Sequence, residues 1–282
     1  MRWLLFLSCL GAFGAALAVG HAVGKKGEKP TVALAALGLI VLGLRLLVPP
    51  AMEFALFSGD LYPVLRPWWP IPTSLALLAA GANHMSTPGS KRGIRLFAGL
   101  LVVSASMPLF QTARFDAGDF NGVVGSDGVC LQTSDYTCGA AAAATLLAAY
   151  GVESDEAEMA ERCWTNSMTG TDEFCVARGL RQKLAGTGRE VRLVSSDWEA
   201  LLARGGRPAM ATIRYSTFVD HWVVIFGVEG ETVLVGDPLE GRRRMGKNKF
   251  LEVWRGGLVI ADLPGSQQRP SPAGSAALSS GQ

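Results

Sequence analysis

Charged residues and histidine are both scarce in this sequence. Asp, Glu, Lys and Arg make up 18% of its 282 residues, and histidine occurs three times. A soluble domain usually carries about 25% charged residues. The shortage of charge is local, because residues 1–111 consist largely of long apolar runs whereas residues 150–263 have an ordinary soluble composition. We therefore expect a chain in two parts, with the lipid bilayer as the partner of the first part.

The sequence lacks the residues that several functional classes of protein need. The five cysteines form no CxxC pair, and together with three histidines they do not have the spacing of a structural zinc site. No GxxxxGK[ST] segment occurs, so we expect no ATP site in this chain. The net charge is only +2 and there is no basic stripe with interleaved aromatic residues, which argues against nucleic acid as a partner. We expect no metal ion and no cofactor.

Four apolar segments, each of about 18 residues or more, are long enough to cross a bilayer. They cover residues 3–24, 31–48, 68–85 and 94–111. The first segment could instead be a signal peptide. However, it is long and a single basic residue, Arg2, precedes it, which favours a membrane span. The sequence thus predicts an all-α transmembrane anchor of about four helices over residues 1–111.

Lysine and arginine concentrate in the first and third connections between these segments, at residues 25–29 and 91–95. Such loops prefer the cytoplasmic side. The second connection, residues 49–67, is then outside, and with four helices both termini are outside as well. We expect an integral protein of the inner or plasma membrane whose soluble part faces the extracytoplasmic side.

The remainder of the chain has the pattern of an α+β domain. A Gly/Asp-rich linker over 112–128 precedes a domain over 129–263, and the Pro/Ser-rich residues 264–282 are expected to be a disordered tail. Helices are expected first, at 139–150, 155–164 and 172–184. A mostly antiparallel sheet follows, with strands at 190–194, 208–214, 221–228, 231–236 and 258–262 and short helices at 197–204 and 248–254.

Cys138 and His221 are candidates for nucleophilic catalysis. Cys138 directly precedes an Ala-rich run, so its sulfur would lie at a helix N-terminus, where the partial positive charge favours the nucleophilic thiolate. His221 is the one histidine outside the membrane segments, and it begins an apolar strand. Considered separately, a buried structural thiol and a partly exposed histidine are the commoner explanations.

Asp237 and Gln132 complete the candidate site. A tight turn at Glu229–Gly230 would pair position 221 with about position 238, which brings Asp237 within reach of His221. There its carboxylate would orient the imidazole, although an Asp-Pro turn is the alternative explanation. Gln132, six residues before Cys138, could donate from its amide to a developing oxyanion beside the backbone N–H of Cys138.

Two segments resemble a known family. Residues 132–141 (QTSDYTCGAA) resemble the active-site signature of the bacteriocin-processing, double-glycine cysteine peptidases, and residues 221–227 (HWVVIFG) with 233–238 (VLVGDP) resemble their second signature. Over residues 129–263 this resemblance implies a papain-like fold. It also implies a Cys138–His221–Asp237 triad with Gln132 as the oxyanion donor.

The layout departs from that family, whose members are typically the N-terminal, cytoplasmic domain of an ABC exporter and cut leader peptides after Gly-Gly. Here the domain follows the membrane segments and no ATPase motif occurs. The resemblance therefore carries over cysteine peptidase chemistry but not Gly-Gly cleavage or coupling to ATP, and it leaves a separate transporter open as a partner.

The sequence thus predicts a membrane-anchored cysteine peptidase that acts on a peptide or protein substrate. One alternative is an amidase or transpeptidase that acts on cell-wall or peptide amides with the same residues. Another is an inactive, peptide-binding membrane sensor, which the intact set of four residues argues against. Cys163 and Cys175 flank a short loop, where they form either a disulfide or two buried thiols.

Overall fold

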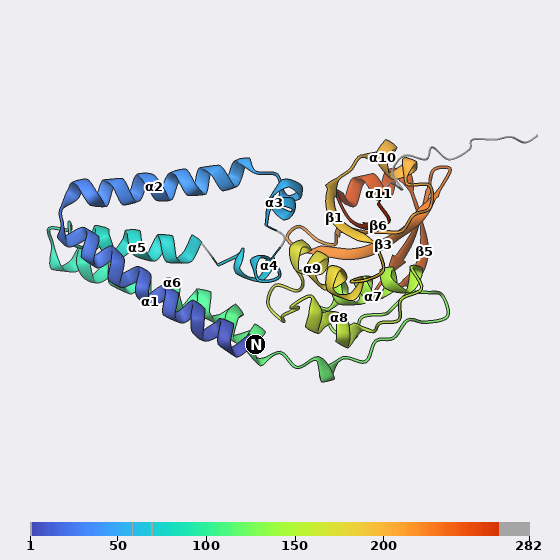
Figure 1. Ribbon diagram of the computed structural model, residues 1–282, viewed down its shortest axis with the longest axis horizontal. Coiled ribbons are helices and arrows are strands. Elements are labelled where there is room, and N and C mark those ends of the chain that lie inside the picture. The colour runs from blue at the N-terminus through green and yellow to red at the C-terminus, as the bar shows by residue number, and fades with distance from the viewer. Residues whose placement is uncertain (1, 58, 69, 265–282) are drawn as a thin grey trace, which may run out of the picture. The chain divides into compact units, whose positions relative to one another are not determined.

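The computed structural model describes residues 2–57, 59–68 and 70–264 (Figure 1). The chain forms two compact units. Among these described residues, one unit contains those up to Asp116 together with Trp164–Gly170, and the other contains Ala117–Cys163 and those from Thr171 to residue 264. The tail expected over 264–282 lies, apart from residue 264, outside the described residues.

Within its described residues the first unit is helical. Its helices are α1 (Arg2–Lys25), α2 (Glu28–Leu47), α3 (Pro50–Leu56), α4 (Tyr62–Leu65), α5 (Pro70–Ala82) and α6 (Pro88–Arg114). By length and composition α1, α2 and α6 can each cross a membrane. Helix α5 has 13 residues, about 20 Å at 1.5 Å per residue, which is less than the roughly 30 Å hydrocarbon core. Three of the four expected segments therefore have spanning length, and the segment expected over 68–85 is a shorter helix.

Glycines let α1 and α5 pack closely. A Cβ on Gly20 would collide with the backbone of Ala76, and one on Gly24 would lie 2.5 Å from the Ala80 carbonyl oxygen. Glycines four residues apart that face small residues are a common way for membrane helices to approach each other. This contact explains how the short helix α5 is held within the unit.

The second unit has the expected order of helices and strands. Helices α7 (Cys138–Ala149), α8 (Glu156–Arg162) and α9 (Glu173–Lys183) come first, after a 3-10 turn at Ala117–Asp119. A six-stranded antiparallel sheet follows in the order β1-β6-β2-β3-β4-β5. The strands are β1 (Glu190–Ser195), β2 (Ala209–Arg214), β3 (Asp220–Glu229), β4 (Thr232–Asp237), β5 (Gly241–Gly246) and β6 (Trp254–Asp262). This arrangement confirms the α+β prediction.

The hairpin of β3 and β4 differs in register from the expectation. Glu229 pairs with Thr232, so the turn residues are Gly230 and Glu231 rather than Glu229 and Gly230. A register shift between Ile225 and Gly227 moves the rest of the ladder, which ends at Val224 opposite Gly236. Positions 221 and 238 are thus not a ladder pair, and Asp237 reaches His221 with its side chain beyond the last pair.

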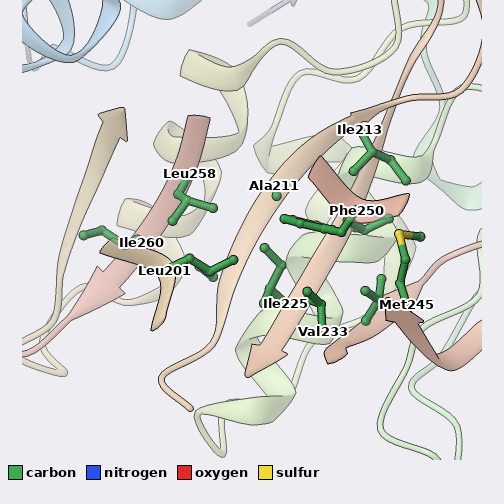
Figure 2. Packing of buried hydrophobic residues seen from close by; sticks show 12 residues of the cluster. Leu201, Ala211, Ile213, Ile225, Val233, Met245, Phe250, Leu258 and Ile260 are labelled. Atoms are coloured by element: carbon green, nitrogen blue, oxygen red, sulfur yellow. The ribbon is translucent and has the colours of Figure 1, made fainter. Parts of the chain in front are cut away.

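The two faces of the sheet pack against different helices. On one face, buried residues of β2–β6 pack with Leu201 of α10 (Trp198–Ala203) and Phe250 of α11 (Lys247–Val253) (Figure 2). On β3 this cluster contains Val223 and Ile225, whereas Trp222, which precedes Val223, would contact a Cβ placed on Gly139 of α7. Because successive residues of a strand point to opposite faces, α7 covers the other face.

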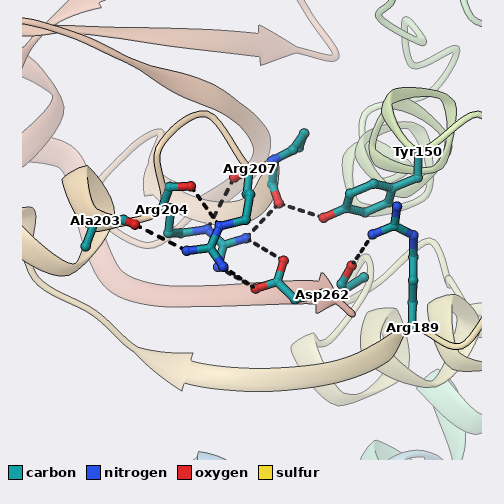
Figure 3. Close-up of polar contacts among 8 residues, drawn as sticks. Tyr150, Arg189, Ala203, Arg204, Arg207 and Asp262 are labelled. Atoms are coloured by element: carbon teal, nitrogen blue, oxygen red, sulfur yellow. Dashed lines mark hydrogen bonds and ion pairs between the residues drawn. The ribbon is translucent and has the colours of Figure 1, made fainter. Parts of the chain in front are cut away.

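Helix α7 is the buried centre of this unit. Its residues from Gly139 to Leu147 are all buried, as expected for a helix that is apolar on every side. Its far end is fixed by polar contacts, because the hydroxyl of Tyr150 donates to the Pro208 carbonyl at 2.9 Å (Figure 3). Beside that contact, Arg204 forms a buried bidentate pair with Asp262 at 3.0 Å for both bonds. The catalytic candidate Cys138 is therefore the first residue of a rigidly held element.

Candidate active site

Cys138 opens helix α7 and is half-buried, although the helix behind it is buried from Gly139 to Leu147. Thr137 stands at the N-cap position but does not cap the helix with its side chain. Its hydroxyl instead donates to the Ser134 carbonyl at 2.9 Å. The first N–H groups of α7 therefore lack this side-chain cap, and they lie where a negative charge beside Cys138 would be stabilised.

His221 connects Cys138 with Asp237. Its Nε2 lies 2.7 Å from Oδ1 of Asp237, and the Cys138 side chain is near enough to the ring to raise its pKa. Because Asp237 occupies Nε2, Nδ1 is the ring nitrogen that remains available to the sulfur. His221 and Asp237 are 5% and 2% exposed, so bulk water does not compete with the contact between them.

The neighbours of His221 favour its charged form. Burial lowers the pKa of the ring, but the hydrogen bonds to Asp237 and Cys138 outweigh this effect and raise the pKa to about 9. Burial by itself would raise the pKa of Asp237. Hydrogen bonds from His221 and from the N–H of Leu239, with the charges of His221 and Arg243, lower that pKa instead. The site thus stabilises an imidazolium beside a carboxylate.

Arg243 is a member of this site that the sequence did not indicate. Its guanidinium lies 2.7 Å from Oδ2 of Asp237, while Oδ1 accepts from His221 and from the N–H of Leu239 at 2.9 Å. Both oxygens of Asp237 are therefore held. Arg243 belongs to β5, a strand that was not expected, and the one sequence signal for it was the Arg242–Arg244 run.

Gln132 lies beside this site in a fixed loop. Its backbone N–H donates to the Pro238 carbonyl at 2.9 Å, which joins the loop to the turn that follows Asp237. Its side-chain Nε2 donates to the Ser134 carbonyl at 2.8 Å, and its Oε1 is buried without a hydrogen-bond partner. Gln132 is thus near Cys138 in sequence and its backbone is held in place. Its side-chain amide donates to a carbonyl of its own loop.

The other cysteines of this unit are buried thiols. Burial raises the pKa of Cys130 to about 12, assisted by the charges of Glu156 and Asp155, and it raises the pKa of Cys163 to about 12. Cys175 is 7% exposed. The sulfur of Cys163 lies 3.9 Å from the Val176 carbonyl oxygen and leaves no room for a Cβ on Gly179. Of the two alternatives for Cys163 and Cys175, the structure contains the buried thiols rather than a disulfide.

Within residues 2–57, 59–68 and 70–264, no group of three or more His, Cys, Asp or Glu residues could hold a metal ion. The reactive groups that the structure brings together at this site are a thiol, an imidazole, a carboxylate and amide donors. That combination supports transfer of an acyl group through a thioester.

Comparison with known proteins shows that this part of the chain is similar to cysteine peptidases. Residues 127–264 match the Peptidase C39 family. An uncharacterized protein of Methanothermobacter marburgensis is 29% identical over 144 residues, or 51% of this chain and 94% of that protein. The probable functional amyloid protease FapD of Pseudomonas aeruginosa is 29% identical over 153 residues, or 50% of this chain and 62% of FapD. Among solved structures, the peptidase domain of Streptococcus ComA has a TM-score of 0.42 at 21% identity, covering 47% of this chain and 96% of that domain.

Proposed function

We propose that this chain, in which residues 127–264 are a cysteine peptidase domain of the C39 family, is a membrane-anchored enzyme that hydrolyses peptide bonds with Cys138, His221 and Asp237. The observation that carries this proposal is the continuous contact from thiol to imidazole to carboxylate. It includes the 2.7 Å bond between His221 and Asp237 and the proximity of the Cys138 side chain to the His221 ring, whose pKa it raises.

In the proposed reaction the Cys138 sulfur attacks the carbonyl carbon of the scissile bond as a thiolate, and the proton of the thiol resides on Nδ1 of His221. Collapse of the tetrahedral intermediate breaks the C–N bond, and the imidazolium donates its proton to the leaving amine. A water molecule then attacks the thioester and transfers a proton back to His221. The acid is released and the thiol is restored. Asp237 keeps Nε2 occupied throughout and stabilises the imidazolium.

The oxyanion of both intermediates would be held by the backbone N–H of Cys138 and by Nε2 of Gln132. Two observations support Gln132 in this role. Its loop is tied to the Asp237–Pro238 turn, and the uncapped N-terminus of α7 adds a favourable dipole on the same side. Substrate binding would exchange the Ser134 carbonyl for the substrate oxygen as the acceptor of the Gln132 amide.

We further propose that helices α1, α2 and α6 anchor the enzyme in a membrane, with the shorter α5 as the returning segment between α2 and α6. The length and apolar composition of α1, α2 and α6 support this. The lysines and arginines at residues 25–29 and 91–95 support a cytoplasmic position for those two connections. The peptidase domain would then act on peptides or proteins on the extracytoplasmic side. Substrates made in the cytoplasm would reach it through a separate transporter.

The test is turnover of a peptide library by the full chain in nanodiscs. The Cys138→Ala protein should cleave nothing, whereas Cys175→Ala, which removes a buried thiol outside the site, should cleave the same peptides as the unaltered protein. Cleavage by the Cys138→Ala protein would refute the proposal. If the unaltered protein releases products only from cell-wall amides, the amidase alternative replaces the peptidase.

A further inference from the structure

Glu156 is a fully buried carboxylate that the proposed reaction does not use. It is the first residue of α8, and its side chain is 0% exposed. Oε1 accepts from the backbone N–H of Thr133 at 2.8 Å. Oε2 accepts from the Thr133 hydroxyl at 2.6 Å and from the N–H of Gly122 at 3.0 Å.

These contacts satisfy both oxygens of the buried side chain. Two of the partners are backbone N–H groups and the third is a hydroxyl, so each oxygen has at least one hydrogen bond. Among the described residues no ion pair involves Glu156, so neutral donors and the N-terminus of α8 replace the water that burial removed. Removing any of these donors would leave a buried oxygen with fewer hydrogen bonds and would lower the stability of the fold. The carboxylate and the loop that carries Thr133 therefore stabilise each other.

The anchored loop is the one that carries Gln132. Thr133 directly follows Gln132, and on its other side the backbone N–H of Gln132 is bound to Pro238. Gln132 thus stands between two anchors, one beside Asp237 and one on Glu156. From there the loop reaches Cys138 through a turn in which Thr137 and Ser134 hydrogen-bond each other.

The Glu156 carboxylate is closely packed against the backbone at Gly122. A Cβ on Gly122 would lie 2.6 Å from Oε2 of Glu156 and would collide with the Leu131 carbonyl. The backbone N–H of Glu156 in turn donates to the Gly122 carbonyl at 2.9 Å. The segment at Gly122, the loop and α8 therefore close tightly around one carboxylate.

We infer that Glu156 is a positioning residue of the oxyanion site, which acts by holding the Gln132–Ser134 loop at the distance from Cys138 that catalysis requires. This inference rests on the proposed oxyanion role of Gln132. It predicts that Glu156 affects the transition state and not the thiol–imidazole pair, because none of its hydrogen bonds involves Cys138 or His221.

The first experiment compares two reactions of the Glu156→Gln protein in nanodiscs. A glutamine amide would face donors and lose at least one of the three bonds, so the loop would shift. We expect kcat for peptide hydrolysis to fall about tenfold with little change in KM, since a small misplacement at a reacting centre is costly. Alkylation of Cys138 by iodoacetamide, which needs no oxyanion site, should keep its rate. The matched control is Glu158→Gln in the same helix, which removes an ion pair with Lys183 and should leave both rates unchanged.

The second experiment is a double-mutant cycle with Gln132→Ala. If Glu156 acts through Gln132, then Glu156→Gln should lower kcat by less than about twofold in the Gln132→Ala background. A full additive loss there, or a parallel loss of alkylation, would overturn the assignment of Glu156 alone. An unchanged kcat in the Gln132→Ala single variant would remove the oxyanion role itself and this inference with it.

Variants of Thr133 keep the test decisive if Glu156→Gln does not fold. Thr133→Val removes the hydroxyl that donates to Oε2 and keeps the backbone bond to Oε1. It should lower kcat without changing alkylation. Thr133→Ser retains the hydroxyl and should restore kcat. Equal kcat values for the two variants would contradict the inference.

Discussion

His221 is held between a carboxylate and a thiol, and these two neighbours decide its charge. Burial opposes the imidazolium, but the bonds to Asp237 and Cys138 overcome this and bring its pKa to about 9. The donor to the leaving amine is therefore present at neutral pH without further activation. Arg243 and the N–H of Leu239 keep Asp237 ionised and in place.

The pH dependence of hydrolysis should follow from this raised pKa. We expect kcat/KM to decline above about pH 9, as His221 loses its proton. The same shift stabilises the fold. Its contribution to the free energy of unfolding is complete below the ordinary histidine pKa of 6.5 and is lost as the pH rises through about 9.

NMR titration of the His221 ring in the Asp237→Asn protein measures the cause directly. Removing the carboxylate charge should lower the His221 pKa and move the basic limb of kcat/KM to lower pH. Asp220→Asn is the control, because Asp220 is an exposed carboxylate paired with Arg255 and should not affect the titration. An unshifted His221 in the Asp237→Asn protein would contradict the assigned triad.

Gln132 should affect the rate and not substrate binding. Gln132→Ala should reduce kcat by about 10²–10³, the usual loss for one oxyanion donor, with KM nearly constant. The control is Gln182→Ala, which removes an amide from α9 outside the site. Steady-state kinetics of both variants decide the point: a higher KM at constant kcat would make Gln132 a binding residue.

At the scale of elements, the site depends on how closely α7 approaches the sheet. Cys138 is fixed because the helix behind it is buried, because its far end is tied to Pro208 through Tyr150, and because Gly139 lets its first turn meet β3. A Cβ on Gly139 would lie 2.7 Å from Cβ of Thr171 and 3.1 Å from the Trp222 ring. Glycine is thus required by contact at this position.

Gly139→Ala should therefore displace the start of α7. We expect the free energy of unfolding to fall by about 1–3 kcal/mol, as for other overpacked cores, with a loss of kcat because Cys138 moves. Gly246→Ala is the matched control, since nothing lies within 4 Å of its added Cβ, and it should change stability by less than about 0.5 kcal/mol. Urea unfolding of both variants measures the difference; equal stabilities would refute the close approach.

Most elements could be predicted from the sequence because their patterns are local. The Ala-rich helix at 139–150 and the apolar strand at 221–228 are examples. Strand β5 could not, because it is an edge strand with a polar Arg242–Arg244 run in place of an apolar alternation. The predicted register of β3 and β4 was wrong, because the turn lies one residue later than expected and a bulge shifts the pairing further. Neither feature leaves a signal in the sequence. The roles of Arg243 and Glu156 depend on contacts between distant segments, which no spacing indicates.

At the scale of the whole molecule, a helical unit with three helices of spanning length precedes a peptidase unit. The proposed side of the membrane rests on the distribution of charge alone. The basic connections at 25–29 and 91–95 can both be cytoplasmic only if the chain returns across the membrane between α2 and α6. The short helix α5, packed on Gly20 and Gly24 of α1, is the element available for that return.

A reporter that is active only outside the cytoplasm should give a signal when fused after Gln282. The same reporter fused within residues 83–87, between α5 and α6, should stay silent, and a cytoplasmic reporter should show the reverse at both sites. Reporter activity in cells is the measurement. A cytoplasmic signal from the fusion after Gln282 would refute the proposed orientation and leave the chemistry of the site unaffected.

Site-specific labelling tests the central claim, a thiol activated by His221, most directly. The full chain is treated with iodoacetamide at neutral pH, and the modified residue is identified by peptide mass spectrometry with time. We predict rapid modification of Cys138, slow or no modification of the buried Cys130, Cys163 and Cys175, and a large drop in the Cys138 rate in the His221→Ala protein. A Cys138 that reacts no faster than the buried thiols, or equally fast without His221, would contradict the account.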